Sequence, residues 1–220
     1  MECGVSGSAV TTVVNQPLDI QRLINYINAA WIDIQELHAD WNFMRQSFQF
    51  NTAAGQQVYT PLQIGIPVVG TVTAIGNWKV DSFRNYLTSG GVGGEQFMTH
   101  YDYDTFNNLY LFGGQRLIQQ QPIAFTVDMT KNLVLGPTPN DIYTVNGQYF
   151  RKPAELVADA DEPSIPSEFH LGIVYKAMMS YGSYEAAPEV YQRGQDEYNK
   201  MRSKIEIDQL PPMTMGAPLV

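Results

Sequence analysis

Residues 133–170 constrain the fold more than any other part of this 220-residue chain. They read LVLGPTPNDIYTVNGQYFRKPAELVADADEPSIPSEFH and place two strands, a turn, a connecting segment and a helix start in a fixed order. The Pro-Thr-Pro-Asn-Asp run fixes φ and favours local side-chain hydrogen bonds, so the first strand reverses tightly into the second. The second strand, over residues 143–150, is predicted to be interrupted by a bulge or bend at Asn146-Gly147 and to stop at Pro153.

An acidic connector and a helix start follow that second strand. The connector contains Asp159, Asp161 and Glu162, and the helix is expected to begin near Pro166, where hydroxyls, a proline and an early glutamate favour a first turn. Clustered carboxylates can serve acid/base chemistry or bind a cation. This cluster lacks the glycine and the closing glutamate of a calcium loop, so the pattern favours a solvated linker.

Helical periodicity dominates both ends of the chain. Apolar residues recur every three or four positions from Pro17 to Trp41, which predicts an amphipathic helix of about six turns. Two further stripes lie between Phe169 and Ile205 and are separated by a break before Pro188. We expect the tryptophans of the first helix to pack in a core and not to form an aromatic ligand box.

The middle of the chain has the period of strands. Residues 48–60 predict a short hairpin, and a short helix is expected at Tyr101–Phe106 with Asp102 or Asp104 as its cap. The predicted strands are 48–52, 58–60, 68–75, 78–86, 119–128, 132–136 and 143–150. The Gly-rich loop 89–94 is expected to be a linker or an exposed finger, because no Lys-Ser or Lys-Thr follows it as in a phosphate-binding loop.

Together these patterns predict an α+β fold, in which a helical bundle formed by the N- and C-terminal helices carries an inserted antiparallel β-sheet or small β-barrel. The expected parts are a flexible N-terminal extension over 1–16, a helical bundle over 17–46 and 164–207, an inserted β-rich domain over 47–163, and an extended C-terminal arm over 208–220. The arm holds three prolines and a glycine and cannot form a regular helix. It is either disordered in a monomer or docked in an assembly.

Composition narrows the function. With 44% hydrophobic and 16% charged residues the chain is globular, and its polar, weakly charged surface suits contacts with other subunits. A net charge of −9 argues against a phosphate-binding surface, although an acidic lining would repel a DNA backbone and keep it moving; the same acidity also aids solubility. We expect no secretory signal and no transmembrane segment, and therefore a soluble protein made in a reducing cytoplasm.

We find no pattern of residues that predicts catalysis or metal binding. The lone Cys3 has no partner for a disulfide or a zinc site. His38, His100 and His170 fall on three separate elements and in no zinc-binding spacing, and no Gly-x-Ser-x-Gly elbow is present. The sequence therefore predicts a protein that is not an enzyme and that carries no cofactor or metal.

The ordered string of strand, Gly-Pro-x-Pro turn, Tyr-rich strand, Arg-Lys-Pro, acidic linker and Ile-Pro-Ser-Glu-Phe-His resembles the head-to-tail adaptor (connector) proteins of tailed bacteriophages. The resemblance extends more loosely over roughly residues 17–205, through the segments Trp41-Asn42-Phe43-Met44, Phe48-Gln49-Phe50-Asn51-Thr52 and Gly55-Gln56-Gln57-Val58-Tyr59. Residues 1–16 and the loop 89–94 have no counterpart that we can place.

The resemblance implies a structural virion protein at the head–tail junction, synthesised in the host cytoplasm. A homo-oligomeric ring of twelve copies would bind the portal on one side and tail or nozzle proteins on the other. DNA would pass through the ring without sequence-specific binding, and the protein would not bind a membrane. The resemblance also favours docking of the arm, with candidate assembly contacts at Leu210, Pro211, Pro212, Met213, Met215 and Leu219.

Two other functions remain open. One is a different phage tail-completion or collar protein that lacks the portal contact. The other is a small carbohydrate- or ligand-binding β module, in which some of the 13 tyrosines would form an aromatic platform.

Overall fold

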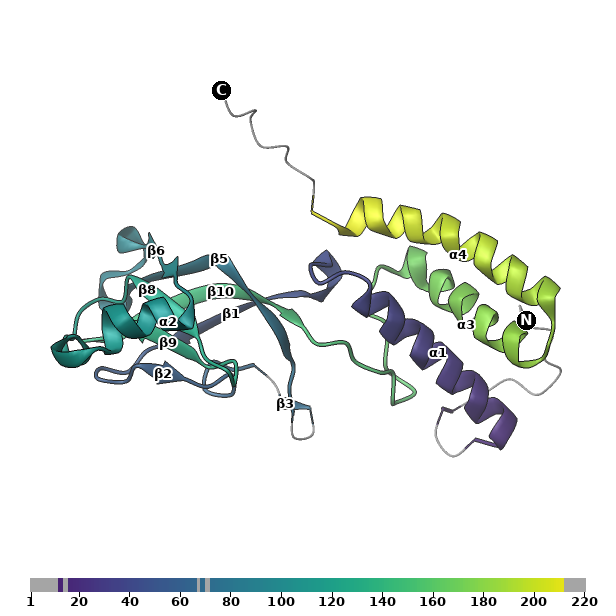
Figure 1. Ribbon diagram of the computed structural model, residues 1–220, viewed down its shortest axis with the longest axis horizontal. Helices are drawn as coiled ribbons and strands as arrows, with labels where there is room; N and C mark the ends of the chain where they lie inside the picture. Colours follow the sequence, from purple (N-terminus) through teal and green to yellow (C-terminus); the bar gives the residue numbers. More distant parts are fainter. Residues whose placement is uncertain (1–11, 14–15, 67, 70–71, 212–220) are drawn as a thin grey trace, which may run out of the picture. The chain divides into compact units, whose positions relative to one another are not determined.

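A computed structural model shows a chain of two compact units (Figure 1). The helical unit combines residues 1–44 with 153–220, and the β unit comprises residues 45–152. The structure describes residues 12–13, 16–66, 68–69 and 72–211. Helices and mainly antiparallel sheets occur together, so the predicted α+β class is confirmed. Within the described ranges the sheets do not close into a barrel.

The described part of the helical unit contains three long helices, and α3 packs against both α1 and α4. Its elements are α1 (Leu18–Glu36), η1 (Asn42–Met44), η6 (Ser167–Phe169), α3 (His170–Tyr184) and α4 (Pro188–Gln209). Glycines permit the close approach of α3 and α4. A Cβ on Gly194 would lie 2.8 Å from the Tyr175 carbonyl oxygen, and one on Gly182 would lie 2.6 Å from the Tyr191 nitrogen.

The prediction that the first helix reaches Trp41 is wrong, because α1 ends at Glu36. The fully buried Trp41 instead lies in the segment that follows, and its Nε1 donates a hydrogen bond to the Ile34 carbonyl oxygen at 2.9 Å. That oxygen lies in the last turn of α1, where carbonyls lack partners within the helix. Trp41 thus continues the three- or four-residue spacing of the apolar residues in α1, but it lies beyond the helix and its side chain covers the helix end.

Two other helix boundaries differ from the sequence prediction. A single 3-10 turn follows Pro166, and the α-helix begins only at His170. At the other end α4 continues to Gln209, so the extended arm cannot begin at residue 208. Asp208 and Gln209 are polar residues that suit either a helix or an extended segment, and Pro211 prevents a further helical turn.

The described residues of the β unit form two four-stranded sheets and one two-stranded sheet. Sheet A has the order β1-β10-β5-β6, sheet B has the order β2-β9-β8-β7, and β3 pairs with β4. Their bounds are β1 (Arg45–Asn51), β2 (Val58–Tyr59), β3 (Val68–Val69), β4 (Val72–Thr73), β5 (Ile75–Leu87), β6 (Gln96–Phe97), β7 (Thr99–His100), β8 (Ala124–Val127), β9 (Leu133–Gly136) and β10 (Tyr143–Arg151).

An aromatic core lies between the two sheets. The ring of Phe83 on β5 stacks on that of Phe125 on β8 with centroids 4.0 Å apart, and both side chains are fully buried. Phe48 contacts Trp78 and Phe83 at centroid distances of 5.2 and 5.3 Å. Burial of such large rings is the main source of stability for a unit of this size.

The predicted hairpin over residues 48–60 is wrong. β1 pairs with β10 in sheet A, whereas β2 pairs with β9 in sheet B, so the turn after β1 carries the chain from one sheet to the other. The backbone N–H of Ala53 donates to the Tyr59 hydroxyl at 3.0 Å, which holds this crossing. The alternation of residues identifies strands but does not say which strands pair.

Three further differences concern single strands. The predicted strand over 68–75 is divided into β3 and β4, and the next strand begins already at Ile75. The predicted strand over 119–128 is regular only from Ala124 to Val127. β7 runs parallel to β8, an exception to the antiparallel prediction.

The bulge predicted at Asn146-Gly147 in the Tyr-rich strand, which is β10, is confirmed. The pairing of β10 with β5 shifts register between Asn146 and Gln148. A Cβ on Gly147 would lie 2.7 Å from the Phe48 ring, so only glycine fits between this strand and the core. The predicted cap is also confirmed, because Asp102 accepts a hydrogen bond from the Thr105 N–H at 3.0 Å and starts α2 (Tyr103–Phe106).

Candidate assembly surfaces

The three histidines lie at separate places and have local roles. His38 Nε2 lies 3.2 Å from Glu206 Oε1, and His170 Nε2 lies 3.0 Å from the Ile165 carbonyl oxygen. Partial burial lowers the pKa of His100, and the neighbouring Asp102 opposes this effect. Among the described residues no three His, Cys, Asp or Glu side chains gather as metal ligands do.

The acidic connector folds on itself. Asp161 Oδ2 accepts the backbone N–H groups of Val157 and Ala158, each at 2.7 Å, and these bonds, led by that from Ala158, lower the pKa of the carboxyl. Asp159 instead accepts the N–H of Val13 at 2.5 Å. The carboxylates therefore stabilise a turn and anchor a preceding segment.

No helix within the described ranges is long and apolar enough to cross a membrane.

Two of the six candidate assembly contacts lie within the described residues. The Leu210 N–H donates to the Glu206 carbonyl oxygen at 3.2 Å, which ends α4, and Leu210 is half-buried while Pro211 is exposed. The remaining candidates lie outside the described residues; they are Pro212, Met213, Met215 and Leu219. The predicted N-terminal extension over 1–16 also lies largely outside them.

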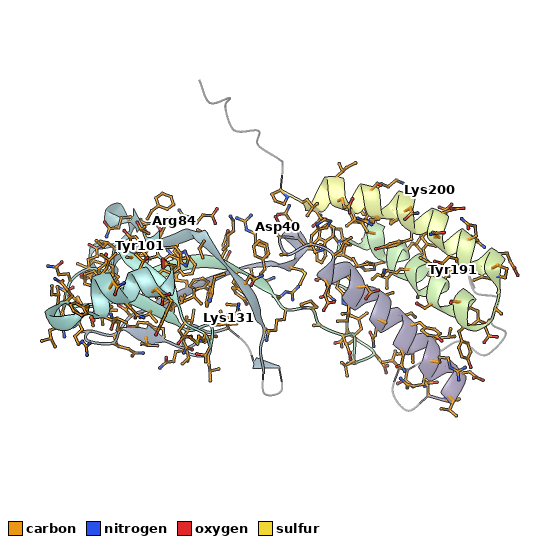
Figure 2. All side chains as sticks on the ribbon, viewed as in Figure 1. Asp40, Arg84, Tyr101, Lys131, Tyr191 and Lys200 are labelled. Carbon is orange, nitrogen blue, oxygen red and sulfur yellow. The ribbon has the colours of Figure 1, made fainter. Side chains whose placement is uncertain are left out.

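The two units carry very different charge. The helical unit contains six Lys and Arg against sixteen Asp and Glu, which gives a formal charge of −10, whereas the β unit contains seven against six and has a charge of +1. Part of this acidity is paired along α4, as in the contact of Lys200 with Glu197 at 2.6 Å (Lys200 is labelled in Figure 2). The acidity of the whole chain is thus a property of its helical unit.

The outer face of sheet A is polar and contains a shallow groove. Its volume is about 350 Å³, and it is lined by Ser47, Phe48, Gln49, Ser82, Arg84, Asn146, Gly147 and Gln148. Arg45 Nε donates to Gln148 Oε1 at 2.8 Å, and Asn146 Nδ2 donates to Glu95 Oε1 at 3.4 Å. The buried Oδ1 of Asn146 has no partner in the part of the chain that the structure describes. Amide and hydroxyl groups of this kind suit a polar subunit contact.

Large apolar side chains are exposed beside this face and at a second place in the β unit. Phe97 on β6 is 72% exposed, and the Arg84 guanidinium lies 5.5 Å from its ring centroid (Arg84 is labelled in Figure 2). Phe112 and Leu117, in the segment between α2 and β8, are 73% and 79% exposed. Exposed aromatic and arginine side chains are typical of interface centres. Sequence reasoning missed them, although a phenylalanine directly before Gly113-Gly114 was an available signal.

No curated protein matches the chain. The family model described as SU10 adaptor protein matches residues 7–217, which span both units and nearly the whole sequence. The resemblance to phage head-to-tail adaptors is thereby confirmed, and a structural role in the virion follows from it. The chain belongs to the SU10 adaptor protein family.

Proposed function

We propose that twelve copies of this chain form a ring that joins the portal to the tail at the head–tail junction. The family match over residues 7–217 carries the proposal. A closed ring of identical subunits requires two unlike surfaces on each copy. The acidic helical unit and the amide-rich outer face of sheet A, which belongs to the nearly neutral β unit, are surfaces of this kind.

In this proposal α1, α3 and α4 act as a helical bundle that lines the conduit. A formal charge of −10 on that unit disfavours the counterion release that drives phosphate binding. Repeated around a ring, this charge repels the DNA backbone and lets the duplex pass without sequence-specific contacts. The β unit, with exposed Phe97 and Phe112, then meets tail or nozzle proteins.

The predicted arm belongs to the same proposal. It would begin at Leu210, after the last turn of α4, and contact the portal or a neighbouring copy through the six candidate residues. Each such contact is small, and repetition around the ring gives the assembly its stability.

Mixing the purified chain with purified portal tests the proposal by mass photometry and negative-stain microscopy. We expect portal-bound rings of one stoichiometry, with portal alone and adaptor alone as controls. A chain that remains monomeric with portal but binds tail proteins would indicate a collar or tail-completion protein, and one that binds only glycans would indicate a carbohydrate-binding module.

The conduit lining has a separate test. Fluorescence anisotropy with a labelled duplex should show no binding by the ring at moderate salt. Duplex binding that weakens steeply as salt is added would contradict a repulsive lining.

A further inference from the structure

β1 is a long strand with a free edge. All seven of its residues pair with β10 in unbroken register, and within the described ranges no strand pairs with its other side. It contains neither proline nor bulge, and its one charged residue, Arg45, is at its end. Natural sheets usually protect such edges with charges, prolines or bulges, because an open edge is a template for another strand.

The direction of the backbone groups in β1 follows from one hydrogen bond beyond its end. The Thr52 N–H donates to the Tyr143 carbonyl oxygen at 2.8 Å, toward β10. Because these directions alternate in an antiparallel pair, the N–H and C=O groups of Ser47 and Gln49 point to the free edge. An added strand would find its donors and acceptors at these positions.

The side chains of β1 define what such a strand must look like. Phe48 and Phe50 face the core and remain 8% exposed, and the Phe50 ring lies 5.0 Å from that of Tyr59 on β2. Ser47 and Gln49 face outward and are exposed. The added strand must therefore alternate apolar side chains toward these rings with small or polar ones outward.

Residues 213–217 have this pattern. They read Met-Thr-Met-Gly-Ala, with apolar residues at positions 213, 215 and 217, and prolines at 212 and 218 bound the segment. Prolines are tolerated where a strand begins or ends. Methionine is flexible, fills irregular space and makes favourable contacts with aromatic rings. Five residues in a strand span roughly 17 Å, which fits within the seven-residue edge of β1.

We propose that residues 213–217 of one copy add as a strand to the free edge of β1 in a neighbouring copy. This inference rests on the proposed ring, in which every copy supplies one segment and one edge, so that head-to-tail pairing covers every edge. The β-branched run at residues 10–14 fits less well, because the Val13 N–H already donates to Asp159 within the helical unit.

Disulfide trapping between two differently labelled chains tests the pairing directly. One chain carries Gln49→Cys and the other Thr214→Cys, both in a Cys3→Ser background, because both positions are expected on the outer face of the extended sheet. Rings assembled on portal from the mixture should give a heterodimer on oxidation. Replacing Thr214→Cys by Lys200→Cys, which places the thiol on exposed α4, is the matched control and should give about tenfold less product.

Blocking the edge is the second measurement. Gln49→Pro removes an N–H that points to the free edge and leaves the β1–β10 hydrogen bonds in place, whereas Gln49→Thr keeps that N–H. Because position 49 is now substituted, Ser47→Cys takes the place of Gln49→Cys as the partner of Thr214→Cys. Rings with Gln49→Pro should then yield about threefold to tenfold less cross-link than rings with Gln49→Thr, which is the effect of one lost hydrogen bond. Equal thermal unfolding of the two variants would show that both fold.

The outcomes separate this inference from the proposed function. Rings that form on portal but give no heterodimer above the control, or that cross-link Gln49→Cys and Thr214→Cys only within one chain, overturn the strand addition and leave the ring intact. Failure of the unmodified chain to form rings with portal rejects the proposed function itself.

Discussion

Gly147→Ala should destabilise the β unit through a single added methyl group. The new Cβ would lie 2.7 Å from two carbons of the Phe48 ring and 3.4 Å from the Phe83 ring. Ordinary carbon contacts begin near about 3.5 Å, so the Phe48 ring must move by nearly an ångström. It cannot do so freely, because Trp78 and Tyr149 also pack against it at centroid distances of 5.2 and 6.4 Å.

Overpacking of this kind costs about 1–3 kcal/mol. For a unit of about this size each kcal/mol lowers Tm by about 4–8 °C. Scanning calorimetry, with near-ultraviolet circular dichroism to follow the aromatic core, measures the change. The matched control is Gly93→Ala, whose Cβ would meet nothing within 4 Å, and we expect its unfolding free energy to stay within about 0.5 kcal/mol of the unmodified protein.

A double-mutant cycle checks the cause. Phe48→Leu makes room for the new methyl group, so the loss in the double variant should be smaller than the sum of the two single losses by about 0.5–3 kcal/mol. Additive losses, or a Gly147→Ala protein as stable as Gly93→Ala, would refute the steric argument.

Three further changes test the structure elsewhere. Trp41→Phe removes the indole N–H that covers the end of α1, and the buried carbonyl left behind should lower the free energy of unfolding by about 1–3 kcal/mol, measured by denaturant titration of helical circular dichroism; an unchanged midpoint would contradict this role. Gly194→Ala sets a Cβ 2.8 Å from the Tyr175 carbonyl oxygen, so the same titration should show a loss larger than for Gly93→Ala in the β unit. Burial by itself would raise the pKa of Asp128, but hydrogen bonds from a neighbouring threonine and asparagine outweigh it and lower the pKa. The carboxylate therefore contributes stability above its unfolded pKa of about 3.9, which is lost as pH falls through the lower folded value. Asp128→Asn should flatten the acid limb of the stability curve measured between about pH 5 and 2, and an unaltered limb would exclude this contribution.

Sequence reasoning succeeded where the signal was local. The Asn146-Gly147 bulge, the Asp102 cap and the strands on either side of the Pro-Thr-Pro-Asn-Asp turn all follow from a few neighbouring residues. It failed for Trp41, whose spacing continued the helical stripe although its side chain covers the helix end. A hydrophobic period shows that a residue is buried, but it does not show which element buries it.

The candidate surfaces divide in the same way. The acidity of the helical segments and the alternation of Met213 to Ala217 can be read from the sequence. The sequence could not show that β1 has a free edge. Apolar and polar residues alternate in both strands, so the sequence is equally compatible with a hairpin in which β1 pairs with β2.

By itself, the sequence determined the α+β class, the family resemblance and most element types, because propensity, capping and turn chemistry act over a few residues. Only the tertiary structure decided that β1 joins β10, that Gly147 must lack a side chain beside Phe48, and that Phe97 and Phe112 remain exposed. These features depend on contacts between residues far apart in the chain, and such contacts form only when the two sheets pack together.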